Sequence, residues 1–166
     1  QKMEGRYILI AVFVGAGATL ITDIWNLFLK RSFNIQSLNF CYLGHWIMYM
    51  PEGTFRHPNI RTAEPKSLEC VLGWVAHYTI GITLTLFFVT IIVSFQWLIQ
   101  PDFLSALLYG IATVIFPLFI LQPSLGLGLA SAKTPDPWQA RLKSMVTHIV
   151  FGAGLWLSAQ ISRQFL

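Results

Sequence analysis

The strongest constraint on this chain is the presence of four long apolar segments within 166 residues. They cover about residues 7–29, 69–94, 102–122 and 143–162. Each approaches the ~20 residues that an α-helix needs to cross the hydrocarbon core of a bilayer. Because only helices and closed barrels satisfy every backbone polar group in lipid, we expect these segments to be helical. The sequence therefore predicts an all-α polytopic membrane protein with four transmembrane helices, forming a single transmembrane domain over residues 1–166.

The composition agrees with this prediction and narrows the partners. Hydrophobic residues make up 55% of the chain and charged residues 11%, whereas soluble domains carry about 25% charged residues. The formal net charge of +4 does not indicate nucleic-acid binding, because the basic residues are dispersed among the connections and form no single run. The expected partners are therefore membrane lipids, with a second copy of the chain or another membrane protein as alternatives.

The distribution of Lys and Arg predicts the orientation in the membrane. Eight basic residues lie in or beside the first and third connections: Lys30, Arg31, Arg56, Arg61, Lys66, Lys133, Arg141 and Lys143. Three lie on the opposite side: Lys2, Arg6 and Arg163. Since cytoplasmic connections collect positive charge, we expect a bacterial inner-membrane protein with these connections in the cytoplasm and both termini in the periplasm.

The first connection is too long and too apolar for an ordinary linker. Residues 38–50 are mostly hydrophobic but too few to span a bilayer, and Gly44, His45 and Pro51 interrupt them. We therefore expect an interfacial or re-entrant cytoplasmic segment, with the 36–58 loop covering the helix bundle.

Other patterns in the connections predict structural roles. In the third connection, Asp136 followed by Pro137 fits the N-cap and first residue of a helix. The Gly-x-Gly at 126–128 follows no predicted strand, so it does not indicate a dinucleotide site. Cys41 and Cys70 lack the spacing of a zinc site or a CxxC motif, and we expect them to be free thiols.

A short phrase containing a histidine occurs twice, in the second and fourth apolar segments. The copies Val75–Gly81 and Val146–Gly152 share the order Val, small residue, His, two variable residues, large apolar residue, Gly. The preceding apolar segments match weakly as well, since 17–21 resembles 111–115. We therefore predict two helical hairpins related as a parallel repeat, because each unit contains an even number of spans.

Ionisable residues inside these segments mark a candidate site, because a charge in lipid is costly. With a rise of ~1.5 Å per residue, His77 lies roughly 12 Å and His148 roughly 8 Å from the cytoplasmic helix ends. Asp23 lies roughly 9 Å from the same side. The sequence therefore predicts a polar intramembrane site at one depth, extended by Asn26 and Glu69.

Several interpretations of this site stay open. In a purely structural one, the histidines bond to threonines or backbone carbonyls, and Gly81 and Gly152 let helices approach closely. The leading functional hypothesis is a site that binds or moves a small polar solute or a lipid headgroup, with proton coupling through Asp23 and histidine as an option. An alternative is an electron-transfer subunit in which His77 and His148 ligate haem b.

A further alternative is a structural or assembly subunit of a membrane complex. Another metal or a membrane enzyme is less favoured, because the sequence has no Ser-His-Asp arrangement, HExxH motif or P-loop. We expect no cofactor outside the haem interpretation.

The first connection supplies a second polar cluster, formed by His45, Glu52, Arg56 and His57. Arg56 beside His57 in an aromatic-rich segment is typical of phosphate or carboxylate binding, and equally of contact with anionic lipid headgroups. We expect this cluster to lie over the intramembrane site.

The motifs form an ordered set: Gly44-His45-Trp46, 53–57, Glu69 with 73–78, 122–128, and His148 with Gly152. In this combination the chain resembles the bacterial family of unknown function numbered 2938, small four-helix inner-membrane proteins. The resemblance runs from about Gly15 to Gly154 and implies the four-span topology and a role for the polar positions. The chain differs from the family at His45, where the family favours Arg, and the resemblance implies no activity.

Overall fold

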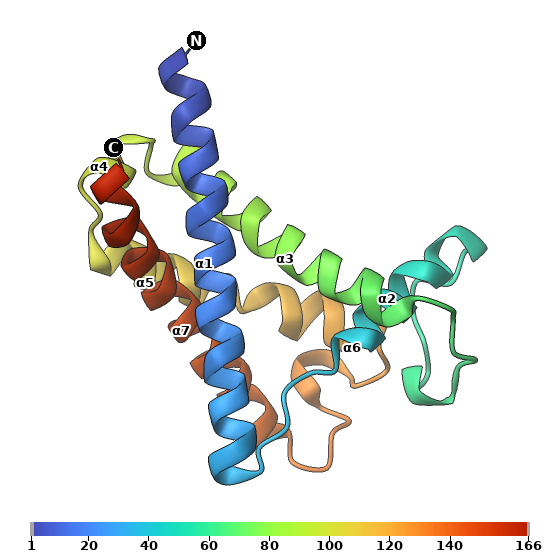
Figure 1. The fold of residues 1–166 in the computed structure, drawn as a ribbon. Helices are drawn as coiled ribbons and strands as arrows, with labels where there is room; N and C mark the ends of the chain where they lie inside the picture. The colour runs from blue at the N-terminus through green and yellow to red at the C-terminus, as the bar shows by residue number, and fades with distance from the viewer. Residues whose placement is uncertain (1, 166) are drawn as a thin grey trace. The chain divides into compact units, whose positions relative to one another are not determined.

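The computed structural model describes residues 2–165, and these residues form helices, turns and loops without a β-strand (Figure 1). The α-helices are α1 (Lys2–Phe33), α2 (Phe40–Tyr49), α3 (Glu69–Phe87), α4 (Gln96–Ile99), α5 (Phe103–Ala112), α6 (Gln122–Ser124) and α7 (Pro137–Ser162). Short 3-10 turns cover Met50–Glu52, Ile60–Thr62, Leu129–Ser131 and Arg163–Phe165. Two π-helical turns cover Phe88–Ile92 and Pro117–Leu121.

Four helical segments are long and apolar enough to cross a membrane: Gly5–Phe33, Glu69–Ile92, Phe103–Ser124 and Pro137–Ser162. Their mean hydropathy lies between 1.3 and 2.3. The prediction of an all-α chain with four such helices is therefore confirmed. The inner-membrane location and the side on which the termini lie stay predictions.

The fourth of these helices begins where its capping sequence predicts. The Gln139 amide donates to the Asp136 Oδ1 at 3.0 Å, and Pro137 is the first helical residue. Asp136 satisfies an N–H group that has no partner inside the helix, and Pro137 has no N–H to satisfy. This confirms the predicted helix start, which lies six residues before the apolar window at 143.

The third segment is not a regular helix throughout. Its regular part ends at Ala112, and a π-helical turn over Pro117–Leu121 leads into α6. Pro117 has no amide hydrogen and its ring crowds the preceding turn, so an undisturbed α-helix cannot pass through it. The Phe116 amide donates to the Thr113 carbonyl at 3.1 Å, a tighter turn that accommodates the break.

The described chain divides into two compact units. The first contains the residues up to Gln36, Tyr78–Ala112 and the residues from Thr147 on. The second contains Ser37–His77 and Thr113–Val146. The prediction of a single transmembrane domain stays a prediction, and so does the parallel repeat.

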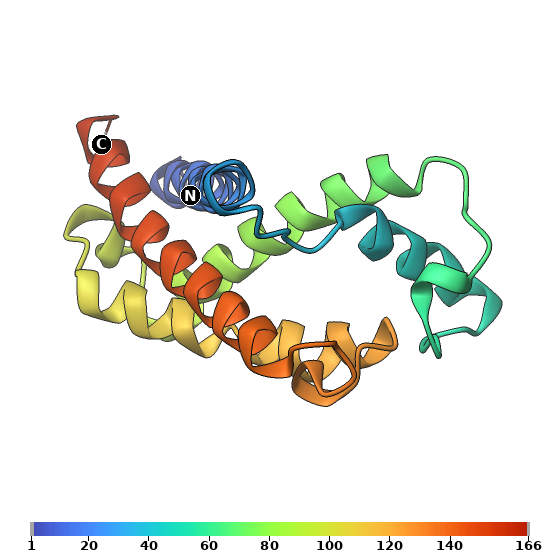
Figure 2. The ribbon, with the colours of Figure 1, turned by 90° about the horizontal axis from the view of Figure 1, so that it is seen from below.

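Small residues bring the helices of the first unit together. A Cβ on Gly81 of α3 would lie 2.0 Å from the Thr19 Oγ1 of α1. A Cβ on Gly17 of α1 would lie 2.6 Å from the Ser158 Oγ of α7, and Figure 2 shows α1 nearly end-on beside this part of α7. A Cβ on Gly152 of α7 would lie 2.7 Å from the Ala106 carbonyl oxygen of α5. Both glycines of the repeated histidine phrase are therefore sites of close helix packing.

In the second unit, α2 crosses the beginning of α3 at two glycines. A Cβ on Gly44 would lie 1.8 Å from the Glu69 carbonyl oxygen, and a Cβ on Gly73 would lie 1.8 Å from the Phe40 carbonyl oxygen. No side chain fits at either position without separating the two backbones. Gly44 therefore determines the approach of α2 to α3.

The prediction of free thiols is wrong. Cys41 of α2 and Cys70 of α3 form a disulfide, with their Cα atoms 3.9 Å apart. The two cysteines lie three residues before Gly44 and Gly73, so the disulfide and the glycine contact share one face of each helix. Spacing along the chain could not reveal this pair, because 29 residues separate its members.

We expect Gly152→Ala to destabilise the protein, because the added methyl group meets the Ala106 backbone of α5. Overpacking of this kind costs about 1–3 kcal/mol. The measurement is the thermal unfolding midpoint in detergent. Gly5→Ala is the control, since a Cβ at Gly5 has nothing within 4 Å, and an equal midpoint in both variants would contradict the prediction.

Candidate functional site

The second unit holds a buried hydrogen bond between two predicted site residues. His45 on α2 and Glu69, the first residue of α3, lie with Nδ1 and Oε2 2.5 Å apart. The Lys66 amide also donates to the Glu69 Oε2, at 2.8 Å. An ionised Glu69 carboxylate only accepts hydrogen bonds, so in that state the His45 Nδ1 is the donor of this bond. The crossing at Gly44 places His45 directly after the closest contact.

A second histidine and a tyrosine complete this cluster. The Tyr49 ring stacks on His45 at a centroid distance of 4.9 Å and meets His57 edge-on at 5.0 Å. The two imidazole rings are 5.9 Å apart. His45 is 3% and His57 6% exposed, and within the described residues neither Nε2 has a hydrogen-bond partner. The His45–His57–Tyr49–Glu69 group is called the histidine cluster below.

The segment that carries His57 is tied to α2 and α3 at several points. The Trp46 Nε1 donates to the Phe55 carbonyl at 2.8 Å, and the Tyr49 hydroxyl donates to the Glu64 carbonyl at 3.0 Å. The Lys66 ammonium pairs with the Glu52 carboxylate and lies 4.3 Å from the Tyr49 ring centroid. This ion pair raises the pKa of Lys66, since the hydrogen bond that its ammonium donates to the Glu52 carboxylate favours the charged form.

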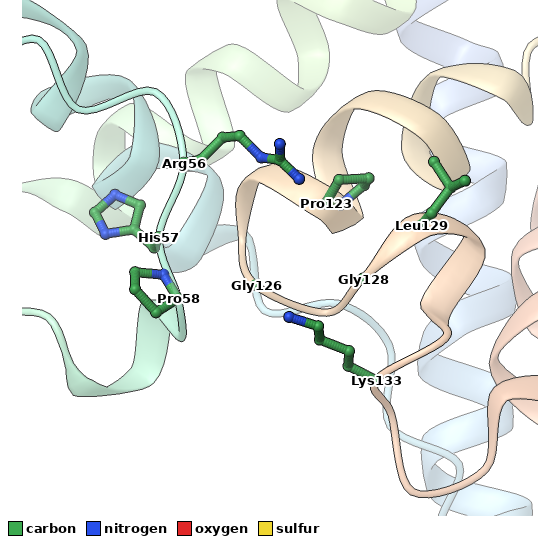
Figure 3. A pocket seen from close by; sticks show the side chains of 8 residues that line it. All are labelled: Arg56, His57, Pro58, Pro123, Gly126, Gly128, Leu129 and Lys133. Atoms are coloured by element: carbon green, nitrogen blue, oxygen red, sulfur yellow. The ribbon is translucent and has the colours of Figure 1, made fainter.

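A pocket of about 360 Å³ lies beside the histidine cluster (Figure 3). Its lining consists of Arg56, His57, Pro58, Pro123, Gly126, Gly128, Leu129 and Lys133. In Figure 3 the Arg56 and Lys133 side chains extend from separate segments toward the loop that carries Gly126 and Gly128, while the His57 ring points away from that loop. This cavity is called the basic pocket below.

Close backbone approach explains the glycines in the wall of the basic pocket. Gly126 has φ +85°, and a Cβ there would lie 2.3 Å from the Pro58 carbonyl oxygen. Gly128 has φ +80°, and a Cβ there would lie 2.9 Å from the Lys133 Cγ. Only glycine adopts such angles at low cost. The Gly-x-Gly pattern therefore serves a tight turn.

Hydrogen bonds join the two sides of the pocket. The His57 amide donates to the Ser124 carbonyl at 2.8 Å, and the Ile60 amide donates to the Leu125 carbonyl at 3.0 Å. Farther along the chain, Ser131 Oγ donates to Gln122 Oε1 at 2.6 Å. The pocket wall is thus fixed by the fold before any ligand arrives.

The basic pocket is electropositive. Two of its lining residues carry a permanent positive charge, and none of the lining residues is acidic. Within the part of the chain that the structure describes, neither Arg56 nor Lys133 forms an ion pair with a carboxylate. An uncompensated cation pair of this kind attracts anions.

The other predicted site residues lie elsewhere. Asp23 and Asn26 are half-buried on α1, and the Tyr78 hydroxyl donates to Asp23 Oδ2 at 3.0 Å. A Cβ on Gly110 would lie 2.6 Å from the His148 carbonyl oxygen. These residues belong to the first unit, whereas His77 belongs to the second. Their convergence on one intramembrane cavity stays a prediction.

His77 packs against aromatic rings of the second unit. Its imidazole stacks on Phe40 at a centroid distance of 3.8 Å and meets Trp74 edge-on at 5.9 Å. The structure therefore gives His77 a packing role near the middle of α3. Haem ligation by this residue stays a prediction.

The sequence interpretation missed two partners of the site. Tyr78 directly follows His77, but nothing in one sequence shows that it reaches Asp23 on α1. Lys133 stands among apolar and small residues of the third connection, and only the turn at Gly128 brings it to Arg56. The repeated Cys-x-Leu-Gly at 41–44 and 70–73 was the available signal for the helix crossing.

The stability of the histidine cluster should depend on pH through His57. Burial and the neighbouring His45 lower the pKa of His57 below its ordinary 6.5. The folded state therefore favours neutral His57, and this contribution is present above pH 6.5 and is lost as the pH falls toward the folded pKa. We expect the unfolding midpoint to fall more steeply below pH 6.5 in the wild type than in His57→Gln. Parallel pH profiles of the two proteins would contradict this assignment.

Comparison with known proteins places the chain in a family. The family model described as "Protein of unknown function (DUF2938)" matches residues 12–162. No curated protein and no solved structure matches the chain. The match begins within α1, ends with the last residue of α7, and includes both the histidine cluster and the basic pocket. The chain therefore belongs to the DUF2938 family of proteins of unknown function.

Proposed function

We propose that this membrane protein binds the phosphate group of an anionic lipid headgroup in the basic pocket. The observation that carries the proposal is the pairing of Arg56 and Lys133 on one cavity whose lining contains no carboxylate. The proposal keeps the leading hypothesis from the sequence, a protein that binds or moves a small polar solute or lipid headgroup. It moves the binding site from the intramembrane histidines to the two connections.

The two cations suit phosphate in complementary ways. The planar guanidinium of Arg56 offers paired donors that match two phosphate oxygens, and the Lys133 ammonium adds a compact charge with rotatable donors. A cavity of about 360 Å³ lies at the small end of ligand pockets. It fits a headgroup or a small solute.

Backbone contacts of the fold hold the walls of the basic pocket in place without a ligand. Two backbone hydrogen bonds hold 57–60 against 124–125, and Gly126 lies directly against Pro58. The Lys133 amide donates to the Leu127 carbonyl at 2.9 Å. Binding therefore spends little free energy on ordering these segments, which favours affinity.

Exposed apolar side chains beside the cations favour a lipid over a free anion. Leu129 lines the pocket and is 59% exposed, and Phe55, the neighbour of Arg56, is also 59% exposed. In a lipid, the phosphate of the headgroup lies next to the apolar acyl chains. A pocket that places cations beside apolar side chains matches this part of a lipid. Inorganic phosphate has the charge that the pocket recognises but no apolar part for Leu129 and Phe55.

The test is titration of detergent-solubilised protein with short-chain phosphatidylglycerol. We expect Arg56→Ala and Lys133→Ala each to weaken binding roughly 10- to 100-fold, since a hydrogen bond to a charged group contributes about 1.5–3 kcal/mol. Arg61→Ala is the matched control, because Arg61 lies on the same connection but does not line the pocket.

Two further titrations distinguish a lipid headgroup from free phosphate as the ligand. Inorganic phosphate should bind far more weakly than phosphatidylglycerol, and short-chain phosphatidylcholine should bind weakly because its headgroup carries no net charge. Equal affinity for inorganic phosphate would instead make the ligand a free anion. Equal affinity of wild type, Arg56→Ala and Lys133→Ala for phosphatidylglycerol would overturn the proposal.

A further inference from the structure

The Cys41–Cys70 disulfide closes the segment that supplies part of the proposed binding site. The middle of this segment carries Arg56 and His57. Glu69, which binds His45, is the residue before Cys70. The covalent link therefore fixes both ends of the segment that forms one wall of the basic pocket.

Two features make this disulfide accessible to chemistry. Cys70 is exposed and Cys41 is half-buried, and Cys70 is the second residue of α3, at the very end of its membrane-spanning segment. Exposed disulfides are the labile ones, whereas buried disulfides resist reduction.

The charge pattern predicts a reducing environment for the pair. The disulfide joins the first connection to α3 on the side that carries eight of the eleven Lys and Arg residues, the side that the sequence places in the cytoplasm. Cytoplasmic thiols are kept reduced, and disulfides that form there are mostly transient, catalytic or redox-sensing. A permanent structural bridge is not expected on that side.

We propose that Cys41 and Cys70 form a thiol–disulfide exchange site, whose oxidised state holds the wall of the basic pocket in place and whose reduced state weakens anion binding. The effect on binding rests on the proposed function, whereas the exchange itself does not. The reductant is a dithiol, either a small molecule or a protein with two neighbouring cysteines.

The exchange runs in two balanced steps. A thiolate of the reductant attacks the Cys70 Sγ and forms a mixed disulfide, while the Cys41 Sγ leaves with the electron pair and takes up a proton. The second thiol of the reductant then attacks the reductant sulfur of this mixed disulfide. A disulfide forms within the reductant, and the Cys70 Sγ leaves and takes up a proton. The chain gains two electrons and two protons, and the dithiol becomes a disulfide.

After reduction of the disulfide, only weaker contacts hold the pocket wall in place. The His45–Glu69 hydrogen bond, the Lys66–Glu52 ion pair and the Gly44–Gly73 crossing remain. These contacts can open individually, so the segment with Arg56 gains freedom that anion binding must then remove. Lys133 is outside the closed segment and is not affected directly.

The exchange is tested by trapping thiols in cells with a maleimide polymer that retards the protein on a gel. We expect both the oxidised and the reduced form in untreated cells. Diamide should convert the protein to the oxidised form, and dithiothreitol should convert it back to the reduced form. Neither treatment should convert Cys41→Ser or Cys70→Ser in this way, because each variant lacks one cysteine of the pair. A pair that stays oxidised in dithiothreitol without denaturant overturns the proposal. So does a pair that stays reduced after diamide.

The effect on binding is measured on purified protein with short-chain phosphatidylglycerol. We expect reduction to weaken binding about threefold or more in the wild type, and the Cys41→Ser/Cys70→Ser double variant to bind equally under both conditions. Equal affinity of oxidised and reduced wild type overturns the link to binding. If neither state binds, the proposed function fails, while the gel result still decides whether the pair exchanges.

Discussion

The contact between the backbones of α2 and α3 is the constraint on which the second unit depends. At Gly44 and Gly73 the two helices come so close that neither position can hold a side chain. This close approach places Cys41 beside Cys70, where the disulfide forms, and His45 beside Glu69, where a hydrogen bond forms. A covalent bond and a charge-assisted hydrogen bond thus stabilise the same crossing.

Several polar groups in this region have partners within the second unit, although within the described residues the Nε2 atoms of His45 and His57 have none. The Glu69 carboxylate hydrogen-bonds to His45 and to the Lys66 amide. Tyr49 packs against both imidazole rings, and its hydroxyl donates to a backbone carbonyl. The basic pocket beside them is different, because its cations face a cavity without carboxylates. A cavity that carries two cations and no carboxylate is suited to an external anion.

Much of the fold follows from hydrophobicity and local capping. Four apolar segments of sufficient length predict four spans, and Asp136 with Pro137 predicts the start of α7, because these signals act over neighbouring residues. Other contacts join residues that lie far apart in the chain. They are the disulfide, the Asp23–Tyr78 hydrogen bond and the shared pocket of Lys133 and Arg56. Their formation depends on tertiary packing, which one sequence does not display. For the site, the sequence indicated His45, Arg56, His57 and Glu69 but not the cavity that Arg56 shares with Lys133.

The two π-helical turns have a consequence for how relatives of this chain can vary. A π-helical turn holds one residue more than the α-helical turn it replaces, so helical positions on either side are offset by a single residue. The turns at Phe88–Ile92 and Pro117–Leu121 lie at the end of one span and near the end of another. Loss of one residue from the Phe88–Ile92 turn would restore a regular helix there and leave the earlier packing glycine, Gly81, on its present face, whereas Pro117 keeps the third span irregular. A change of length at Phe88–Ile92 therefore falls at the end of the second span and leaves the helix contact at Gly81 in place, whereas one at Pro117–Leu121 would move Ser124 and Leu125, which accept hydrogen bonds from the pocket wall.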